Sequence, residues 1–320
     1  MNWIKNTEPG KSEPYRMSQS TFKEFRKYRR GFACGEFVRR VIVGKEFISE
    51  TEYDSPQYWG NVFEWYALGS GEKPERELYK VNQYGKDNPL AGTGYLKGDP
   101  KPNPKFEHAK KQGDAFKDFC DTYEITVRAK DVTITNGDFV GKIDAIVQIP
   151  PEHWDELVNH YHADSELHSE PDNIRQLSKE MVTDRVRWED CKYGEHSGCV
   201  VIDTKYSGII YKKHHKMSFH PDYIEENDYH TVQARHYHAL TGLPFFFYVA
   251  SPSDMTVLFL RIFIEQSNME KHIETCGKYL KMIKAGIYTP RPDSKRCGDC
   301  PLSGDCEHED HTPKVRAAWI

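Results

Sequence analysis

Apolar residues recur along the chain with two periods, which together predict a mixed α/β protein. Short stretches rich in aromatic and β-branched residues predict strands at 123–129, 139–149, 198–206, 245–250 and 255–265. Apolar residues three and four positions apart predict helices at 18–48, around Glu64, at 229–241 and at 269–288. Because strands and helices are interspersed, we expect one central mixed β-sheet flanked by helices.

Two stretches do not follow either period. Residues 69–113 are rich in Gly, Pro and Lys, so we expect them to form loops. Residues 150–198 separate two predicted strands by about fifty positions, which is long for a connection inside a compact domain. We expect this second stretch to fold as a small helical lobe, with residues 173–187 as its most helical part.

Composition limits the class of protein. Hydrophobic residues make up 38% and charged residues 29% of the chain, as is typical of a soluble globular protein. No run approaches the length of a membrane span, and residues 1–11 lack the apolar core of a secretory signal. The eight cysteines are grouped at metal-type spacing, which favours a reducing compartment, so we expect a cytoplasmic protein.

The strand predicted at 198–206 ends in an acid and a lysine one residue apart, Asp203 and Lys205. Side chains alternate between the faces of a strand, so these two project to the same side, and Thr204 offers its backbone carbonyl between them. Asp144 ends a Gly-x-x-Asp stretch on another predicted strand and would add a second carboxylate. This set of groups can hold a divalent cation and fits phosphodiester hydrolysis. An Asp-x-Lys tripeptide alone would indicate little, because charged pairs at strand ends are common.

Two helical segments add polar residues to this set. Glu64 follows Gly60 by four positions on a segment with helical spacing and could supply a third acid. Gln233 and Tyr237 are four residues apart on the helix predicted at 229–241 and therefore share one face.

The four elements occur in the order GxxxE, GxxD, DxK and QxxxY, which resembles the RecB-like nucleases of the PD-(D/E)XK superfamily. The resemblance implies that Glu64, Asp144 and Asp203 bind Mg2+ or Mn2+ and that Thr204 supplies a carbonyl ligand. It also implies that Lys205 is the catalytic lysine. Relatives often have His at the position of Glu64, but Glu is also a suitable ligand for a hard cation.

The same resemblance implies that Gln233 and Tyr237 contact the DNA strand or orient the catalytic lysine. It implies a restriction-endonuclease-like core forming a single domain over residues 1–320. Such nucleases usually have a short hairpin where residues 150–198 stand, so we expect this stretch to be an insertion that shapes the substrate entrance. The expected activity is that of a DNA exonuclease acting on single-stranded or end-containing DNA in recombination, repair or phage DNA processing. Two alternatives stay open: a structure-specific flap endonuclease, and a non-catalytic DNA-binding or assembly component.

Three cysteines form a C-x2-C-x5-C cluster at residues 297–306, namely Cys297, Cys300 and Cys306. Three thiolates need a fourth ligand to hold zinc or an iron–sulphur cluster, and Cys34 is the distant candidate. This arrangement resembles the iron staple of a RecB-like subset that includes AddB and CRISPR-associated exonucleases. The resemblance implies a 4Fe-4S cluster that closes the 297–306 segment onto Cys34, although relatives often have Pro where Gly35 follows that cysteine.

Zinc remains an alternative, since C-x2-C motifs in intracellular proteins are often zinc sites. Two histidines could complete such a site without Cys34, namely His308 and His311. We interpret the other four cysteines as ordinary thiols: Cys120, Cys191, Cys199 and Cys276.

A net charge of −5 does not by itself favour a DNA partner, but basic residues are clustered. One cluster lies on the first predicted helices and the other follows the Asp-x-Lys strand: Lys23, Arg26, Lys27, Arg29, Arg30, Arg39 and Arg40, and then Lys212, Lys213 and Lys216. Either could line a nucleic-acid groove, although the second is equally explained as a solvated surface. The chain has no Walker motif, so any helicase, recombinase or single-strand-binding partner would be a separate protein. Oligomeric state is left open.

Overall fold

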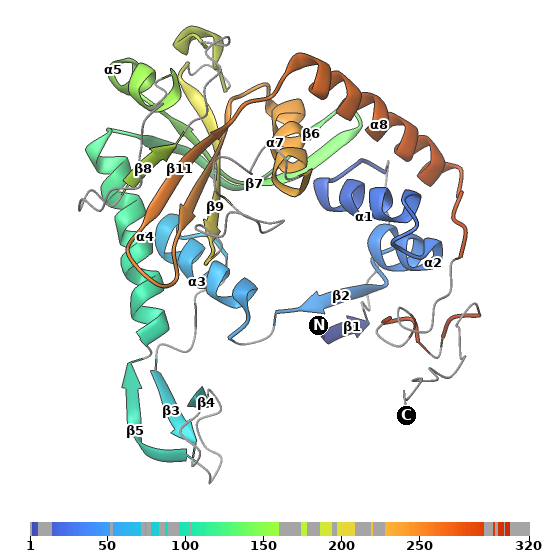
Figure 1. Cartoon of the computed structure of the whole chain (residues 1–320), viewed down its shortest axis with the longest axis horizontal. Coiled ribbons are helices and arrows are strands. Elements are labelled where there is room, and N and C mark those ends of the chain that lie inside the picture. Colours follow the sequence, from blue (N-terminus) through green and yellow to red (C-terminus); the bar gives the residue numbers. More distant parts are fainter. Residues whose placement is uncertain are drawn as a thin grey trace, which may run out of the picture. The chain divides into compact units, whose positions relative to one another are not determined.

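The computed structural model divides the chain into two compact units (Figure 1). The sheet unit comprises Glu52–Ile134 and Gly141–Gln266, and the helical unit comprises Met1–Thr51, Thr135–Val140 and Ser267–Ile320. The expectation of a single domain over residues 1–320 stays a prediction. The structure describes residues 2–5, 15–51, 54–71, 74, 78–82, 87–88, 96–102, 104–159, 174–177, 186–193, 197–208, 219, 228–290, 297, 300–303 and 305–307.

The sheet unit is built on a central mixed sheet, as the sequence predicts, and this sheet has six strands. Its order is β6-β7-β9-β10-β11-β8. β9 lies antiparallel to β7 and parallel to β10, β10 lies antiparallel to β11, and β11 lies parallel to β8. The strands are β6 (Thr126–Asn136), β7 (Phe139–Gln148), β8 (Ile174–Leu177), β9 (Cys199–Tyr206), β10 (Phe245–Ala250) and β11 (Val257–Ile262).

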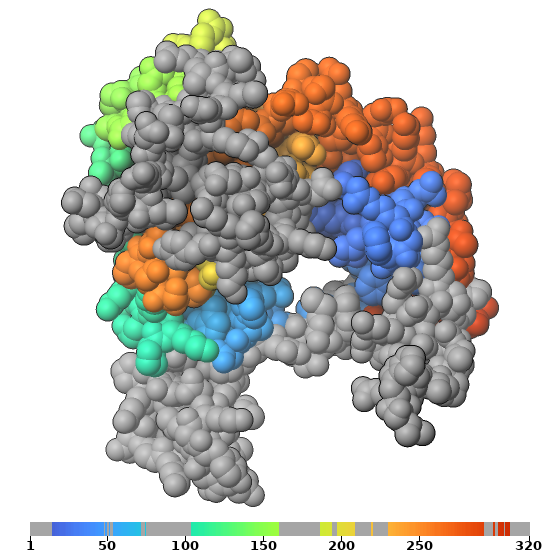
Figure 2. All heavy atoms as spheres, viewed as in Figure 1, coloured from blue at the N-terminus to red at the C-terminus, as the bar shows by residue number. Residues whose placement is uncertain are grey.

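Helices cover both faces of the sheet. α3 (Pro56–Leu68) and α4 (Pro104–Thr122) pack side by side, and α7 (Asp228–Thr241) follows β9 in the chain (Figures 1 and 2). Phe63 of α3 stacks on Tyr248 of β10, with ring centroids 6.4 Å apart. His230 of α7 lies 5.4 Å from the ring of Phe247. Because neighbouring residues of a strand point to opposite faces, α3 and α7 lie on opposite sides of β10.

The expectation of loops over residues 69–113 is wrong in two places. Part of the stretch forms a three-stranded sheet of β3 (Leu78–Asn82), β4 (Asp87–Asn88) and β5 (Leu96–Pro102). The nineteen-residue helix α4 also begins there, at Pro104. Its apolar residues have helical spacing, but many lysines and acids lie between them. Together with the Gly- and Pro-rich residues before the helix, these charged residues hide the helical pattern in the sequence. The buried apolar residues of α4 are Phe106, Ala109, Phe116, Phe119 and Cys120.

Gly113 allows α3 and α4 to approach closely. A Cβ atom at this position would lie 2.5 Å from the Cβ of Tyr66 and 2.8 Å from the backbone nitrogen of Ala67. We expect Gly113→Ala to lower the free energy of unfolding by about 1–2 kcal/mol, since overpacking outweighs the better helix propensity of Ala. Gly60→Ala on α3 is the matched control, because its added Cβ would have no neighbour within 4 Å. Equal stability of the two variants in denaturant unfolding would contradict this account of the packing.

The described residues of the insertion include both helical turns and a strand. It begins with α5 (Pro151–Trp154) and a π-helical turn (Asp155–Asn159), and a 3-10 turn at Trp188–Asp190 precedes its end. Within the part expected to be most helical, residues 174–177 form the edge strand β8, so that expectation is wrong there; residues 178–185 lie outside the described residues. The two ends are joined, since the Ile149 N–H donates to the Gly198 carbonyl (2.9 Å) and the Trp188 indole N–H to the Ile149 carbonyl (2.7 Å).

The helical unit contains α1 (Gln19–Arg29), α2 (Gly35–Phe37), a π-helical segment (Val38–Val43) and α8 (Gln266–Lys284). The opening predicted as helical over 18–48 is helical over residues 19–29 and 35–43 with a turn between them, whereas β2 (Phe47–Glu50) pairs with β1 (Asn2–Lys5). Phe25 of α1 packs on Tyr279 of α8, with ring centroids 5.0 Å apart. No helix within the described ranges is long and apolar enough to cross a membrane.

Candidate active site

The sheet unit brings together the three acids that the sequence singles out. Asp144 lies on β7 and Asp203 on the adjacent strand β9, just beyond the paired residues Ala145 and Ile202. The backbone N–H of Thr204 donates a hydrogen bond to Oδ2 of Asp144 (2.9 Å), and the Thr204 hydroxyl donates to the same oxygen (3.2 Å). The Asp144 carboxylate is therefore fixed against β9 at Thr204, the residue that follows Asp203.

Asp203 is the most deeply buried of these acids, with 1% of its surface exposed. The Gln233 side-chain amide on α7 donates to its Oδ1 (2.5 Å), and the Lys205 ammonium forms an ion pair with its Oδ2. Lys205 also donates to the Thr204 carbonyl (3.2 Å) and lies over the ring of Phe247, 5.8 Å from its centroid. A buried charge of this kind requires such partners, since desolvation without them is costly.

Glu64 completes the group from α3. Burial, the largest cause, and the negative charge of Asp144 together raise the pKa of its carboxyl to about 7, against the opposing effect of Lys205. Glu64 is thus close enough to Asp144 and Lys205 to share their electrostatic field. It is placed by Phe63, the preceding residue, whose buried ring stacks on Tyr206 of β9 with centroids 5.5 Å apart.

The QxxxY pair of α7 makes contacts inside the protein. Gln233 bonds to Asp203, as described above, and the Tyr237 hydroxyl donates to the Lys142 carbonyl on β7 (2.7 Å). Burial raises the pKa of Tyr237, and the negative charge of Asp203 adds to the rise, so the phenol stays protonated. These two side chains therefore join α7 to the two strands that carry Asp144 and Asp203; contact with DNA stays a prediction.

The donor set fits a hard divalent cation. Three carboxylates and the Thr204 carbonyl offer only oxygen ligands, which Mg2+ and Mn2+ prefer. The pKa of Glu64 is raised first by burial and then by the negative charge of Asp144, and a cation bound between the two carboxylates would oppose both effects by favouring the ionised form. Lys205 forms an ion pair with Asp203, and the ammonium of Lys142 also acts on Glu64, so two ammonium groups lie near three carboxylates.

Sequence reasoning missed two charged residues next to this group. Lys142 lies on β7 two positions before Asp144, and its ammonium forms an ion pair with Asp131 Oδ1 of β6 (2.5 Å). Both charges act on Glu64, since Asp131 contributes to raising its pKa and Lys142 to lowering it. Strand alternation already places Lys142 and Asp144 on one face, and this was the signal that could have identified the lysine.

The helical unit gathers the four cysteines of the predicted staple. Burial raises the pKa of the Cys300 thiol, and the charges of Cys297, Cys306 and Cys34 raise it further. The three late cysteines lie on successive turns, in which the Cys300 N–H donates to the Cys297 carbonyl (3.1 Å). Soft thiolates in one region can hold zinc or an iron–sulphur cluster. The alternative zinc ligands His308 and His311 lie outside the described residues.

The chain segment that follows α8 lies against Gly35, the residue after Cys34. The Gly35 N–H donates to the Thr289 carbonyl (3.2 Å), and the Thr289 N–H donates to the Tyr28 hydroxyl (2.8 Å). A Cβ at position 35 would lie 2.4 Å from the Thr289 oxygen. Neither Ala nor Pro would fit at position 35, because an added Cβ would clash with Thr289, and Pro would also lack the N–H that donates.

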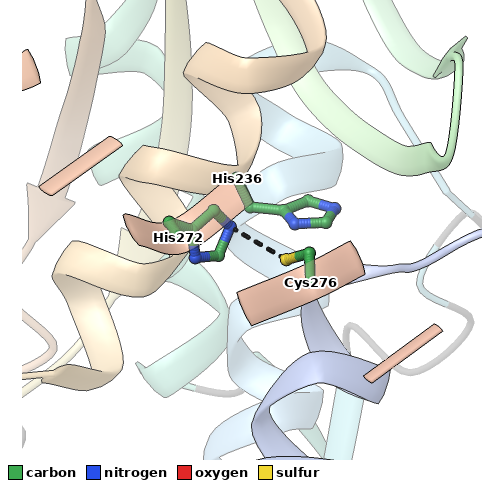
Figure 3. Close-up of side chains that lie close together, drawn as sticks. All are labelled: His236, His272 and Cys276. Atoms are coloured by element: carbon green, nitrogen blue, oxygen red, sulfur yellow. Dashed lines mark hydrogen bonds between the residues drawn. The ribbon is translucent and has the colours of Figure 1, made fainter. Parts of the chain in front are cut away.

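The remaining cysteines behave as buried thiols, as expected. Burial raises the pKa values of Cys120 and Cys191 to about 12 and also raises that of Cys276. Cys276 lies one turn from His272 on α8, and its sulphur is 3.5 Å from the His272 Nε2 (Figure 3). Thiols with raised pKa values stay protonated and unreactive at neutral pH.

No protein-family model matches the chain, and no curated protein matches it. Among solved structures, the chain is similar to a crystal structure of a protein from Eubacterium rectale that is provisionally described as an exonuclease. The two chains are 15% identical, the TM-score is 0.46, and the alignment covers 98% of each. A likeness at this identity and TM-score supports no statement about activity.

Proposed function

We propose that the chain is a metal-dependent DNA exonuclease with a PD-(D/E)XK-type active site. The observation that carries the proposal is the buried Asp203, held between Gln233 and Lys205. Asp144 is tied to the same strand, and the nearby Glu64 brings a third carboxylate. An acid cluster beside a fixed lysine is suited to metal-assisted phosphodiester hydrolysis, because the acids can hold a cation that activates water.

Glu64, Asp144, Asp203 and the Thr204 carbonyl would hold Mg2+ or Mn2+. The bound ion would polarise the scissile phosphate and make its water a better nucleophile. Asp144 accepts two hydrogen bonds from Thr204, so its carboxylate is oriented before any ion arrives. Gln233 orients Asp203 in the same way, and fixed ligands of this kind avoid the cost of reorganisation during the reaction.

Lys205 would orient the attacking water through its ammonium, and only its neutral amine form could deprotonate that water. Its side chain is 29% exposed, so its ammonium is partly open to solvent while paired with Asp203. That ammonium can donate to the water or to a phosphate oxygen without leaving the acid cluster. Replacing this point charge with a neutral side chain would leave both the water and the developing negative charge unsupported.

A basic surface on α1 supports a DNA partner. Phe22, Phe25 and Tyr28 are buried on one side of the helix. Basic residues occupy the exposed positions between and after them, namely Lys27, Arg29 and Arg30. Clustered basic side chains bind the phosphate backbone without sequence preference. The second basic cluster, Lys212 to Lys216, lies outside the described residues, and a separate helicase, recombinase or single-strand-binding partner stays a prediction.

The test is degradation of 5'- and 3'-labelled single- and double-stranded DNA in Mg2+, in Mn2+ and in EDTA. The expected result is metal-dependent shortening from one end, which EDTA stops. Discrete internal cuts near a flap would instead favour the structure-specific endonuclease. DNA binding without cleavage in either metal would favour the non-catalytic component.

Gln233 is expected to act as a positioning residue for Asp203. Gln233→Ala leaves a buried carboxylate oxygen without its donor, so we expect Mn2+ affinity and cleavage rate each to fall about 10- to 100-fold. Gln233→Glu would place a second negative charge against Asp203 and should lower the rate at least as much. A variant with unchanged Mn2+ affinity and rate would show that the hydrogen bond has no functional role.

We also propose that Cys34, Cys297, Cys300 and Cys306 hold a 4Fe-4S cluster. Support comes from the pKa of the Cys300 thiol, which is raised by burial and by the charges of the other three cysteines. Further support comes from the close packing of Gly35 against Thr289. The cluster would be structural and would hold the C-terminal segment to the region of α2. Structural zinc is the alternative, and metal analysis of the anaerobically purified protein separates the two.

A further inference from the structure

Lys142 is the second lysine of the acid cluster, and it differs from Lys205 in exposure. Its side chain is 65% exposed, compared with 29% for Lys205. Its ammonium is paired with Asp131 Oδ1 at 2.5 Å. The hydrogen bond to Asp131 is the main cause of the raised pKa of Lys142, and the nearby charges of Glu64 and Asp144 add to it. An ammonium at the edge of the cluster is therefore open to solvent.

The backbone on both sides of this ion pair is fixed. The Lys142 carbonyl accepts the hydrogen bond of the buried Tyr237. Asp131 has a φ of 51°, a left-handed conformation that Asp tolerates better than most residues. The preceding residue, Lys130, donates from its ammonium to the Leu68 carbonyl at the end of the helix that carries Glu64 (2.8 Å). The ion pair is thus held at a defined place beside the acids.

Stability does not explain the pair well. Exposed lysine–carboxylate pairs contribute little to folding, because solvent screens the charges and the side chains lose freedom. A phosphate oxygen can replace a carboxylate oxygen on the same ammonium, and lysine binds phosphate as a point charge. The neighbouring carboxylates would repel the DNA backbone, and an exposed ammonium beside them would offset that repulsion.

We propose that Lys142 binds a backbone phosphate of the DNA next to the scissile one, and that Asp131 holds its ammonium in place until DNA arrives. This inference rests on the proposed nuclease function and names a further substrate-binding residue for it. It makes opposite predictions for the two partners of one ion pair. Loss of Lys142 removes a phosphate contact, whereas loss of the Asp131 charge removes a competitor of the phosphate.

The experiment measures equilibrium DNA binding by fluorescence anisotropy, with Ca2+ in place of Mg2+ so that the DNA stays intact, across about 50 to 200 mM salt. Lys142→Ala is expected to weaken binding on the order of tenfold. It should also reduce the slope of log affinity against log salt by about one contact. Asp131→Asn keeps the tolerance for a left-handed backbone and is expected to bind as tightly as wild type or more tightly. Lys142→Arg should keep most of the affinity.

Lys117→Ala is the matched control, since Lys117 is also exposed and paired with an aspartate, Asp114, on α4 (3.1 Å). It should leave affinity and salt slope unchanged. An unchanged slope and affinity in Lys142→Ala would overturn the inference while wild-type cleavage upholds the nuclease. Equal weakening by Asp131→Asn and Lys142→Ala would also overturn it, because a merely structural pair behaves that way. A wild-type protein that neither binds nor cleaves DNA would overturn both proposals.

Discussion

Asp203→Asn is expected to lower the rate of DNA cleavage about 10^3-fold in either Mg2+ or Mn2+. The substitution removes a central carboxylate of the site, and metal-ion stabilisation of a transition state amounts to several kcal/mol, where each ~1.4 kcal/mol is tenfold in rate. Asn has the shape of Asp and retains an oxygen that can accept from Gln233. The rate should therefore fall without loss of the fold, as followed by end-labelled DNA degradation and by thermal unfolding.

The matched control for Asp203→Asn is Asp114→Asn, which changes an exposed aspartate of α4 that has no part in the acid cluster. This control should cleave at the wild-type rate. The account of the active site would be contradicted if Asp203→Asn cleaved within a few-fold of wild type. It would also be contradicted if the loss of activity followed only from unfolding, seen as a large fall in the melting temperature.

Cys34→Ser is expected to abolish iron binding and the visible absorption of the cluster, and to destabilise the protein. Cys34 and the late cysteines are separated by about 260 residues of sequence, so a shared cluster greatly restricts the unfolded chain. By analogy with cross-links that close long loops, the loss is roughly 4–5 kcal/mol. For a protein of this size we expect the melting temperature to fall by about 10 °C.

Iron content separates the cluster ligands from the other thiols. Cys306→Ser should lose iron as Cys34→Ser does, whereas Cys120→Ala should retain it, because Cys120 is a buried thiol of α4. Wild-type protein that binds zinc and no iron would contradict the cluster and favour the zinc site. Full iron content in Cys34→Ser would show that the fourth ligand is another residue.

The sequence predicted the elements that carry the acids because each is strongly patterned. β10 is a continuous apolar run and β9 begins with one, and both strands are buried along most of their length. The helix around Gln233 and Tyr237 was predicted to within one residue at its start and ends at Thr241 as expected. Strong local patterns of this kind are preserved by tertiary packing.

The contacts within the site and several elements could not be predicted. Strand alternation gives the face on which Asp203 projects, but not that Gln233 rather than another side chain bonds to it. β8 lies at the sheet edge and pairs with β11, more than eighty residues later in the sequence, so its formation depends on a distant partner. The Lys142–Asp131 pair likewise joins two strands through a left-handed residue that carries no strong sequence signal.

The central claim is that Glu64, Asp144 and Asp203 together hold a divalent cation. The most direct test is Mn2+ binding to the purified protein, followed by the loss of the free Mn2+ signal in electron paramagnetic resonance, for wild type, Asp144→Asn and the control Asp114→Asn. We predict saturable binding by wild type and by the control, and at least tenfold weaker binding by Asp144→Asn. Equal Mn2+ affinity in all three proteins would contradict the account.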